Sequence, residues 1–262
     1  MSDDWAERFA GLRRLYGERA FGLLPALHFA VIGIGGVGSW AAEALARSAI
    51  GRITLVDYDT IEAGNVNRQL HALTDTLDAK KTAVMAARIA QINPRARVDV
   101  IDDFLNMDNL ADILDRGYDF VIDAIDSIKF KAALIHYCRR HRIPVITTGG
   151  AGGLTDPARI QVADLSRTHH DPLASKVRGR LRDRYGFTRN PKRSFGVECV
   201  FSSQQPLYPT PDGEVSHAKP GIHGVSLDCR FGYGTAVAIT ATFGFMAAGR
   251  AIEKCLKKKL AR

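Results

Sequence analysis

The segment LVDYDTIEAGNVNRQLH, residues 55–71, combines an acid with polar and cationic side chains that could bind nucleotide phosphates. Asp57 comes first, Asn65 and Arg68 follow it, and Lys81 stands thirteen residues beyond Arg68. Arginine offers a planar fork of donors and lysine a point charge, the usual pair for phosphate oxygens in phosphoryl or nucleotidyl transfer. A solvated helix face would account for a lysine here but leaves Arg68 without a reason. The series therefore predicts a triphosphate site.

A glycine-rich loop precedes this segment and supplies the second part of the predicted site. The sequence GIGGVG follows a predicted strand and opens a predicted helix, so its backbone can approach a phosphate and the helix N-terminus adds free N–H groups. Asp57, nineteen residues after the loop, is placed to accept hydrogen bonds from ribose hydroxyls. Loop and acid suit either a nicotinamide dinucleotide or ATP, and Arg68 and Lys81 favour ATP because a dehydrogenase has no triphosphate to neutralise. The glycines concerned are Gly33, Gly35, Gly36 and Gly38.

A further acid follows a later predicted strand. In VIDAIDS, Asp126 comes just past the strand predicted over 119–125, on the edge where ligands of open α/β sheets bind. A magnesium ion bridging triphosphate oxygens would need a carboxylate there, although Asp126 could instead cap the following helix. Asp123 lies inside the strand, which indicates a structural role. Asp59 shares a turn with Asp57, and its role is open between assisting the metal and shaping the turn.

Hydrophobic periodicity predicts the elements that carry these residues. Short apolar runs rich in Val and Ile alternate with amphipathic stretches, which is typical of parallel strands joined by helical crossovers. We expect an α/β fold with a doubly wound, Rossmann-like, mainly parallel sheet and helices on both faces over residues 25–150, followed by a C-terminal extension over 151–262. Strands are predicted over 28–34, 52–57, 97–101, 119–125 and 143–148, and helices over 36–49, 80–93 and 128–141.

The C-terminal part is rich in basic residues. Between strands predicted over 159–165 and 196–202, residues 176–193 carry eight basic side chains and one acid. The whole chain has a net charge of +8 and a pI of about 9.5, which favours an acidic partner, nucleic acid first among them. A merely basic enzyme with a solvated helix face is the alternative.

The cysteines and the chain ends indicate an ordinary globular protein in a reducing compartment. Cys138, Cys199, Cys229 and Cys255 form no C-x-x-C pair, so neither a disulfide framework nor a four-cysteine zinc site is expected. The start, MSDDWAERFA, contains acids and no apolar run, which argues against a secretory signal and favours a cytoplasmic location. Residues 231–249 are uncharged and nearly long enough to cross a bilayer, but their glycines and threonines favour a buried helix over membrane association.

Taken together, these motifs resemble those of the ubiquitin-activating-enzyme-like superfamily of ThiF and MoeB, whose members adenylate carboxylates. The matching features are the double-glycine loop, DYDTIEAGNVNRQ, the lysine thirteen residues after the arginine, and the later DAIDS. The resemblance implies a single adenylating domain over residues 1–262 that uses ATP and Mg²⁺. Carried over by position, Gly36 would lie against the phosphates, Asp57 on the ribose, Asn65, Arg68 and Lys81 on the triphosphate, and Asp126 on the magnesium ion.

Within the superfamily the chain is most similar to the branch of tRNA threonylcarbamoyladenosine dehydratases, through VGSWAAEALARS, NVNRQLHAL, IDDFLNMDN, TTGGAGG and DPLASKVRGRLR. This resemblance implies ATP-dependent dehydration of threonylcarbamoyladenosine in tRNA to its cyclic form through a carboxylate adenylate. It also implies a homodimer, and it leaves open whether an accessory or sulfur-relay protein takes part in the reaction. The basic run would hold the tRNA through its phosphates, and the candidate contacts are Lys176, Arg178, Arg180 and Arg182.

Two departures from the superfamily pattern bear on this hypothesis. Relatives carry an N-terminal arginine that reaches the ATP of the partner subunit, and in GLRRLYGERA either Arg14 or Arg13 would take that role. Sulfur-carrier branches usually bear two C-x-x-C pairs for zinc, and their absence argues against the alternative, an activating enzyme for a ubiquitin-like sulfur-carrier protein. The adenylate route demands no cysteine, so Cys199 and Cys229 are expected in the core or a loop rather than as thioester nucleophiles. A nicotinamide oxidoreductase and a non-catalytic tRNA-binding module are less favoured.

Overall fold

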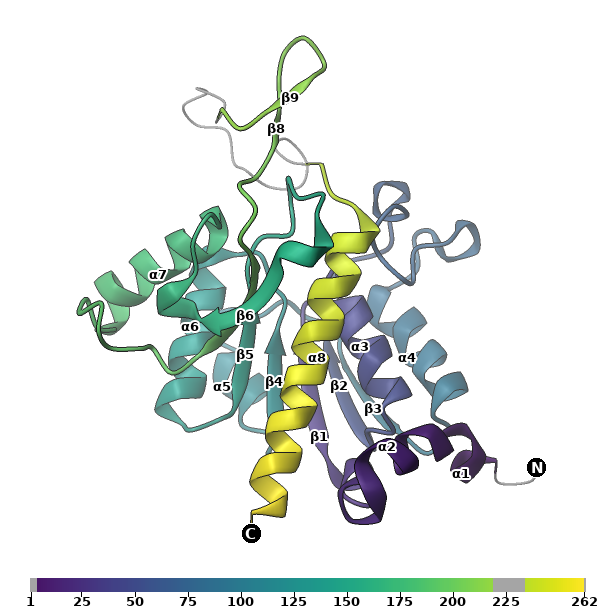
Figure 1. The fold of residues 1–262 in the computed structure, drawn as a ribbon. Coiled ribbons are helices and arrows are strands. Elements are labelled where there is room, and N and C mark those ends of the chain that lie inside the picture. The colour runs from purple at the N-terminus through teal and green to yellow at the C-terminus, as the bar shows by residue number, and fades with distance from the viewer. Residues whose placement is uncertain (1–3, 219–233, 262) are drawn as a thin grey trace.

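The structure is a computed structural model and describes residues 4–218 and 234–261. Its centre is a seven-stranded sheet, and a short two-stranded hairpin lies outside it (Figure 1). The strands are β1 (His28–Ile32), β2 (Arg52–Val56), β3 (Arg97–Ile101), β4 (Phe120–Asp123), β5 (Val145–Thr148), β6 (Ile160–Asp164), β7 (Glu198–Ser202), β8 (Tyr208–Pro209) and β9 (Val215–Ser216). The helices are α1 (Trp5–Arg8), α2 (Ala10–Phe21), α3 (Gly38–Arg47), α4 (Lys81–Ile92), α5 (Leu110–Leu114), α6 (Ile128–Arg140), α7 (Pro172–Tyr185) and α8 (Val237–Leu260).

The seven-stranded sheet has the order β3-β2-β1-β4-β5-β7-β6. Neighbouring strands are parallel except β6 and β7, which are antiparallel. From β1 the chain moves outward to β2 and β3, and it then returns to β4 on the other side of β1. The strand order therefore reverses between β1 and β4, which is where open α/β sheets bind their ligands. The predicted mainly parallel, doubly wound sheet is confirmed, and β6 and β7, which lie beyond residue 150, extend that same sheet.

Alternating side chains of the strands form a separate hydrophobic core on each face of the sheet. On β1, Phe29 and Val31 pack with buried residues of α3, α4 and α8, whereas Ala30 and Ile32 pack with residues of α5, α6 and α7. The alternation arises because successive side chains of a strand point to opposite faces. Burial on both faces explains why these strands appear in the sequence as continuous apolar runs. The expected helices on both faces are confirmed (Figure 1).

The C-terminal helix α8 packs along α3, with Phe243 and Ala247 buried (Figure 1). The two helices approach closely because Gly244 has no side chain, and a Cβ there would lie 2.5 Å from the carbonyl oxygen of Val37. No helix in the described parts of the chain is both long enough and apolar enough to cross a membrane. The expected buried helix is confirmed over residues 237–249 of segment 231–249, residues 234–236 are not helical, and residues 231–233 lie outside the described residues.

Strand β4 ends earlier than the range 119–125 predicted for it. The carboxylate of Asp123 accepts a hydrogen bond from the N–H of Ile125 at 3.3 Å, which turns the chain out of the strand. Asp126 therefore lies on the loop between β4 and α6. The other elements predicted over residues 25–150 coincide with β1, β2, β3, β5, α3, α4 and α6 to within a few residues at their ends.

Candidate active site

Three loops meet at the carboxyl edge of the sheet, where β2, β1 and β4 are neighbours. The glycine loop follows β1, the turn with Asp57 follows β2, and the loop with Asp126 follows β4. The Asp57 carboxylate joins the first two, because Oδ2 accepts the N–H of Ile34 at 2.6 Å and Oδ1 accepts the N–H of Asp59 at 2.9 Å. These bonds hold the glycine loop beside the turn at the switch point of the sheet.

Packing within the protein explains three of the four glycines. Gly33 has φ +87°, in the left-handed region that favours glycine. A Cβ at Gly38 would collide with the carbonyl oxygen of Gly33, and a Cβ at Gly36 would lie 3.2 Å from Cγ2 of Thr240 and 3.4 Å from Cγ of Arg68. Gly33 and Gly38 are therefore required by the loop itself, whatever it binds, and Gly36 packs closely against Thr240 and Arg68.

Gly35 is different from the other glycines of the loop. A Cβ at Gly35 would meet only Nε2 of Gln69, at 4.0 Å, among the residues that the structure describes, and its φ lies outside the left-handed region. Neither packing nor backbone conformation requires a glycine at this position. Gly35 therefore leaves open backbone ahead of the N-terminus of α3, an arrangement that could admit a phosphate.

Arg68 lies against the glycine loop and is held by two helices. Its Nη1 donates to the carbonyl oxygen of Gly64 at 2.7 Å. Its own carbonyl oxygen accepts Nε1–H of Trp40 at 3.0 Å, from α3, and the hydroxyl of Thr240 at 3.3 Å, from α8. The motifs in the sequence do not indicate Trp40 or Thr240, although a hydroxyl inside an otherwise apolar helix is a signal that could have identified Thr240. The C-terminal helix α8 thus helps to position Arg68, which belongs to the N-terminal half of the chain.

Asn65 is buried and shapes the turn that leads to Arg68. It ends the 3-10 helix Ala63–Asn65, and its Oδ1 accepts the N–H of Glu62 at 3.0 Å. Its carbonyl oxygen accepts the N–H of Arg68 at 3.1 Å. In this structure Asn65 therefore acts on the backbone that presents Arg68.

Lys81 opens α4 with its side chain only 7% exposed and its ammonium 2.7 Å from Oδ2 of Asp59. A buried ammonium needs an anionic partner, and Asp59, two residues from Asp57, supplies it. The sequence left the role of Asp59 open, and in the structure its carboxylate pairs with Lys81. The neighbouring Lys80 is exposed and pairs instead with Asp102 at 3.0 Å.

Asp126 is exposed and does not cap the helix that follows it. The cap residue of α6 is Ser127, whose own side chain forms no capping hydrogen bond. The negative charge of Asp59, burial, and the carboxylates of Asp57 and Asp126 raise the pKa of the Tyr58 hydroxyl, so three carboxylates lie around this tyrosine. No three His, Cys, Asp or Glu side chains among the described residues are arranged to bind a metal by themselves. A cation at Asp126 would need further oxygen ligands from a bound phosphate, as Mg²⁺ commonly has.

A buried ion pair supports the loop that carries Asp126. Nζ of Lys131, in α6, lies 3.0 Å from Oδ2 of Asp123, and both side chains are almost inaccessible to solvent. The same Nζ donates to the carbonyl oxygen of Ile125 at 2.8 Å, and the hydroxyl of Thr147 donates to Asp123 at 2.6 Å. These contacts give Asp123 the structural role expected from its place in the strand. Lys131, which the motifs do not indicate, fixes the backbone next to Asp126.

The four cations predicted to contact nucleic acid lie on α7 and differ in exposure. Lys176 is exposed, whereas Arg178 donates to the hydroxyl of Thr168 and burial lowers its pKa. Arg180 has a buried Nε that finds no hydrogen-bond partner in the described structure, and the guanidinium of Arg182 lies 5.4 Å from the centre of a phenylalanine ring. The helix presents Lys176 freely and holds the three arginines partly against the protein.

The N-terminal arginines lie away from the glycine loop of their own chain. Helices α1 and α2 cover the opposite end of the sheet (Figure 1), and Arg19 of α2 donates to the carbonyl oxygen of Leu260, near the end of α8, at 3.2 Å. Arg13 pairs with Glu18 at 2.5 Å, and Arg14 is exposed. Within one chain neither Arg13 nor Arg14 adds to the site.

Cys199 is buried in β7 and is not placed to act as a nucleophile. Burial raises its pKa well above the usual value for a thiol, so the reactive thiolate is disfavoured. Its Sγ–H donates to the carbonyl oxygen of Val200 at 3.5 Å. These observations fit the core position expected for Cys199, while Cys229 lies outside the described residues.

Comparison with known proteins identifies the family to which the chain belongs. The model of the ThiF family matches residues 10–261. The tRNA threonylcarbamoyladenosine dehydratase of Escherichia coli (strain K12) is 53% identical over 259 residues, which cover 98% of this chain and 97% of that protein. Crystal structures of E. coli tRNA N6-threonylcarbamoyladenosine dehydratase, TcdA, with ATP and with AMP are each 50% identical, have TM-scores of 0.88 and 0.89, and match 100% of this chain and 98% of theirs. The chain belongs to the ThiF family.

Proposed function

We propose that this chain is an ATP-dependent tRNA threonylcarbamoyladenosine dehydratase, which cyclises threonylcarbamoyladenosine in tRNA through a carboxylate adenylate. The observation that carries the proposal is the meeting of the glycine loop, Asp57 and Arg68 at the switch point of the sheet, in a chain similar over nearly its whole length to a protein of that name. The similar TcdA structures contain ATP and AMP, which are the substrate and one product of such an adenylation.

In this proposal the nucleotide lies along the carboxyl edge of the sheet. The open backbone at Gly35 and the N–H groups of α3 face the phosphates, and Asp57 accepts hydrogen bonds from the ribose. Asp57 keeps the capacity to do so, because each of its oxygens accepts only one N–H within the described protein and a carboxylate oxygen has two lone pairs. Arg68 and Lys81 neutralise the triphosphate, and Asn65 holds the turn that presents Arg68.

We also propose that Asp126 holds Mg²⁺ together with phosphate oxygens. Its carboxylate is exposed and free of a capping role, and it lies in an acidic environment with Asp57 and Asp59. An acidic, solvated position of this kind suits a hard divalent cation that keeps water and phosphate ligands. The bound ion would supply neutralisation of phosphate charge. Lys131 and Asp123 hold the loop that carries Asp126.

Adenylation makes the dehydration possible because it gives the carboxylate a good leaving group. A carboxylate is a poor electrophile because its leaving group would be oxide. Its attack on the α-phosphorus of ATP forms an acyl-adenylate and breaks the bond to pyrophosphate, while Arg68 and Lys81 stabilise the charge on the departing group. The neighbouring ureido group then attacks the acyl carbon, loses its proton and releases AMP, which carries away the carboxylate oxygen. Ring closure needs mainly orientation, since the nucleophile is already tethered.

The tRNA is held, in this proposal, by the cations of α7. This helix begins at the carboxyl edge of the sheet, because its capping residue Asp171 accepts the N–H of Gly150, just beyond β5, at 3.1 Å. Lys176, one turn into the helix, is therefore on the edge where the nucleotide lies. The remaining contacts of the proposal are Arg178, Arg180 and Arg182, which follow along the helix towards its other end.

A homodimer completes the proposed site. Arg13 and Arg14 lie at the far end of the sheet from the glycine loop of their own chain, so an arginine that reaches ATP must come from a second copy. We assign this role to Arg14, because Arg13 is paired with Glu18 while Arg14 is exposed and forms no ion pair within the described residues. The chemistry as written requires no accessory protein.

A mass measurement on tRNA nucleosides tests the function directly. The protein is incubated with ATP, Mg²⁺ and tRNA carrying threonylcarbamoyladenosine, and the tRNA is digested and analysed by mass spectrometry. We expect the modified nucleoside to lose one water, with AMP and pyrophosphate formed in equal amounts. A nucleoside of unchanged mass in the presence of all three components would contradict the proposal.

Two adjacent lysines provide a matched pair of variants for this assay. Lys81→Met removes the buried ammonium and should slow cyclisation roughly 10²-fold, the usual loss for one group that stabilises a developing negative charge. Lys80→Met removes an exposed ammonium that pairs with Asp102 and donates to the carbonyl oxygen of Tyr58 at 2.8 Å, and it should slow cyclisation far less than Lys81→Met. Equal rates in the two variants would exclude Lys81 from the triphosphate. For the alternative activity, ATP:pyrophosphate exchange would depend on a small protein ending in Gly-Gly and not on tRNA.

A further inference from the structure

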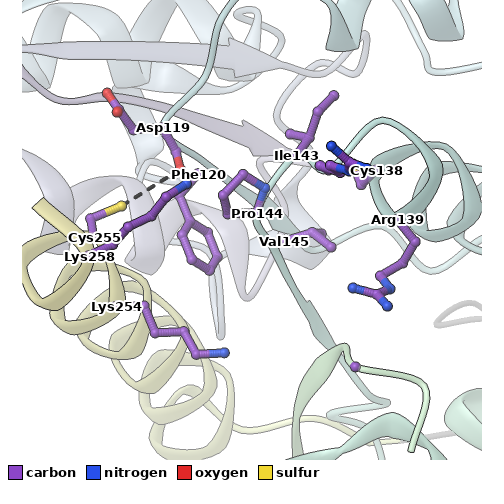
Figure 2. Close-up of a pocket in the computed structure, with 12 residues that line it drawn as sticks. Asp119, Phe120, Cys138, Arg139, Ile143, Pro144, Val145, Lys254, Cys255 and Lys258 are labelled. Atoms are coloured by element: carbon purple, nitrogen blue, oxygen red, sulfur yellow. Dashed lines mark hydrogen bonds between the residues drawn. The ribbon is translucent and has the colours of Figure 1, made fainter. Parts of the chain in front are cut away.

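A cavity of about 400 Å³ lies at the amino edge of the sheet, between α6 and α8 (Figure 2). Its apolar lining includes Phe120 and Val145, at the starts of β4 and β5. Figure 2 shows Lys254 of α8 and Arg139 of α6 on opposite sides of this space. The cavity is at the other end of these strands from the glycine loop, so it is no part of the nucleotide site. The cations that line it are Arg139, Arg142, Lys254 and Lys258.

The cations of this cavity outnumber the acids that could neutralise them. Among the described residues Asp119 is the one acid that lines this cavity, and its charge is already balanced by Lys259, which lies 2.8 Å from Oδ1, while Oδ2 accepts the N–H of His28 at 2.9 Å. Lys254 pairs with Glu198 at 3.1 Å. The cavity therefore keeps an excess of positive charge that attracts anions. Its cations that form no ion pair in the described parts of the chain are Arg139, Arg142 and Lys258.

A second cavity, of about 440 Å³, adjoins the first, and Arg139 lines both. Its lining includes aromatic rings, among them Tyr185, which stacks with His136 at 4.6 Å between ring centres. Cations beside aromatic rings are the combination that RNA-binding surfaces use, because the cations contact phosphates and the rings stack on bases. A single small anion would need only one of the two cavities. We define the cationic band as Arg139, Arg140, Arg142, Arg193, Lys254 and Lys258.

We infer that the cationic band is a second tRNA contact, which binds phosphodiesters away from the nucleoside that is modified. The inference rests on the function proposed above. Strands β4 and β5 have four residues each, so roughly 13 Å of strand separates the two edges of the sheet. Successive phosphates of one duplex strand advance by about 3.4 Å along the helix axis. A tRNA with its modified adenosine at the carboxyl edge therefore has phosphates roughly four or more nucleotides away within reach of the band.

A pair of double variants tests the cationic band. Arg139→Ala/Lys258→Ala removes one unpaired, exposed cation from each side of the first cavity. The matched control, Arg47→Ala/Arg97→Ala, removes two exposed cations from the β3 side of the sheet, where each has an acidic partner. Each phosphate contact contributes about 0.9 to the slope of log affinity against log salt concentration. We expect the first variant to lower this slope by about two, to weaken tRNA binding at low salt at least ~10-fold, and to leave ATP affinity and the maximal rate unchanged.

The outcomes distinguish a failure of the inference about the cationic band from a failure of the proposed function. Equal tRNA affinity and salt dependence in the two double variants would overturn the inference. So would binding of inorganic pyrophosphate that Arg139→Ala/Lys258→Ala abolishes while tRNA affinity persists, because the cavity would then belong to a small anion. An unaltered protein that fails to cyclise modified tRNA would refute the proposed function, and the inference with it. If the unaltered protein cyclises modified tRNA and Arg139→Ala/Lys258→Ala binds tRNA as tightly as the unaltered protein does, only the inference about the cationic band is refuted.

Discussion

Removal of the Lys131 charge tests how the fold holds the loop that carries Asp126. In Lys131→Met, the completely buried carboxylate of Asp123 loses the ammonium that lies 3.0 Å away. Breaking a buried ion pair by removing one partner costs about 3–5 kcal/mol, because it leaves an uncompensated charge. One kcal/mol corresponds to about 2–4 °C in a domain of this size. The melting temperature should therefore fall by roughly 6–20 °C.

A second substitution separates the lost charge from the lost side chain. Asp123→Asn/Lys131→Met removes both charges and should recover at least half of the lost free energy of unfolding, since the amide can still accept the hydroxyl of Thr147. Burial already raises the pKa of Asp123, and the pKa rises further without Lys131. The folded single variant then binds a proton that the unfolded chain does not hold, so its deficit should shrink as the pH falls from about 8 to about 5.

Urea unfolding followed by tryptophan fluorescence measures these free energies, and the cyclisation assay measures a second effect. Lys131 donates to the carbonyl oxygen of Ile125, next to Asp126, and methionine cannot replace this bond. Cyclisation should therefore stay slow in the double variant even though its stability recovers. A single variant within about 1 kcal/mol of the unaltered protein, or a double variant no more stable than the single, would refute the reasoning.

Three further predictions concern the loop, a buried histidine and a cysteine. Gly38→Ala should lose at least about 3 kcal/mol of unfolding free energy. Gly35→Ala should keep the urea midpoint of the unaltered protein and bind ATP at least ~10-fold more weakly. Equal ATP affinity in Gly35→Ala and the unaltered protein would show that Gly35 faces no ligand. Burial lowers the pKa of His28 from 6.5 to about 4. On acidification the unfolded chain therefore binds a proton at a higher pH than the folded protein does, and about 3 kcal/mol of the free energy of unfolding is lost as the pH falls between these two pKa values. His28→Gln should flatten this dependence in urea titrations at several pH values, and an unchanged slope would count against the assignment. Cys199→Ala should cyclise modified tRNA at the unaltered rate, and an inactive but folded variant would restore the thioester route.

The sequence was sufficient for the sheet and for the edge at which the site lies. Strands buried on both faces give continuous apolar runs, and crossover helices give amphipathic stretches, so both elements leave a local signal. The glycine loop and Asp57 belong to one β-α-β unit, so their separation along the chain predicts that they meet. Strands β1 and β4 each end two residues before their predicted ends. For β4 the cause is the turn at Asp123, which depends on a single hydrogen bond from the N–H of Ile125.

The partners of the charged residues were decided by the tertiary structure. Asp59 could not be assigned from the sequence, because its contact with Lys81 depends on how the turn after β2 packs against the start of α4. Arg68 is held by Thr240, 172 residues further along the chain. The three arginines of α7 that were predicted to contact nucleic acid looked like Lys176 in the sequence, but their partial burial against the protein distinguishes them from it.

By itself, then, the sequence of this protein determined an α/β sheet, a glycine loop and a set of polar groups suited to a triphosphate, since these depend on local periodicity and on spacing within one structural unit. The tertiary structure alone decided which charges are buried in pairs, as Asp123 and Lys131 are, and which gather without an ion-pair partner among the described residues, as Arg139 and Lys258 do at the other edge of the sheet. The physical reason is that the energy of a charge depends on its burial and on the groups around it. Both come from elements that meet only when the chain has folded.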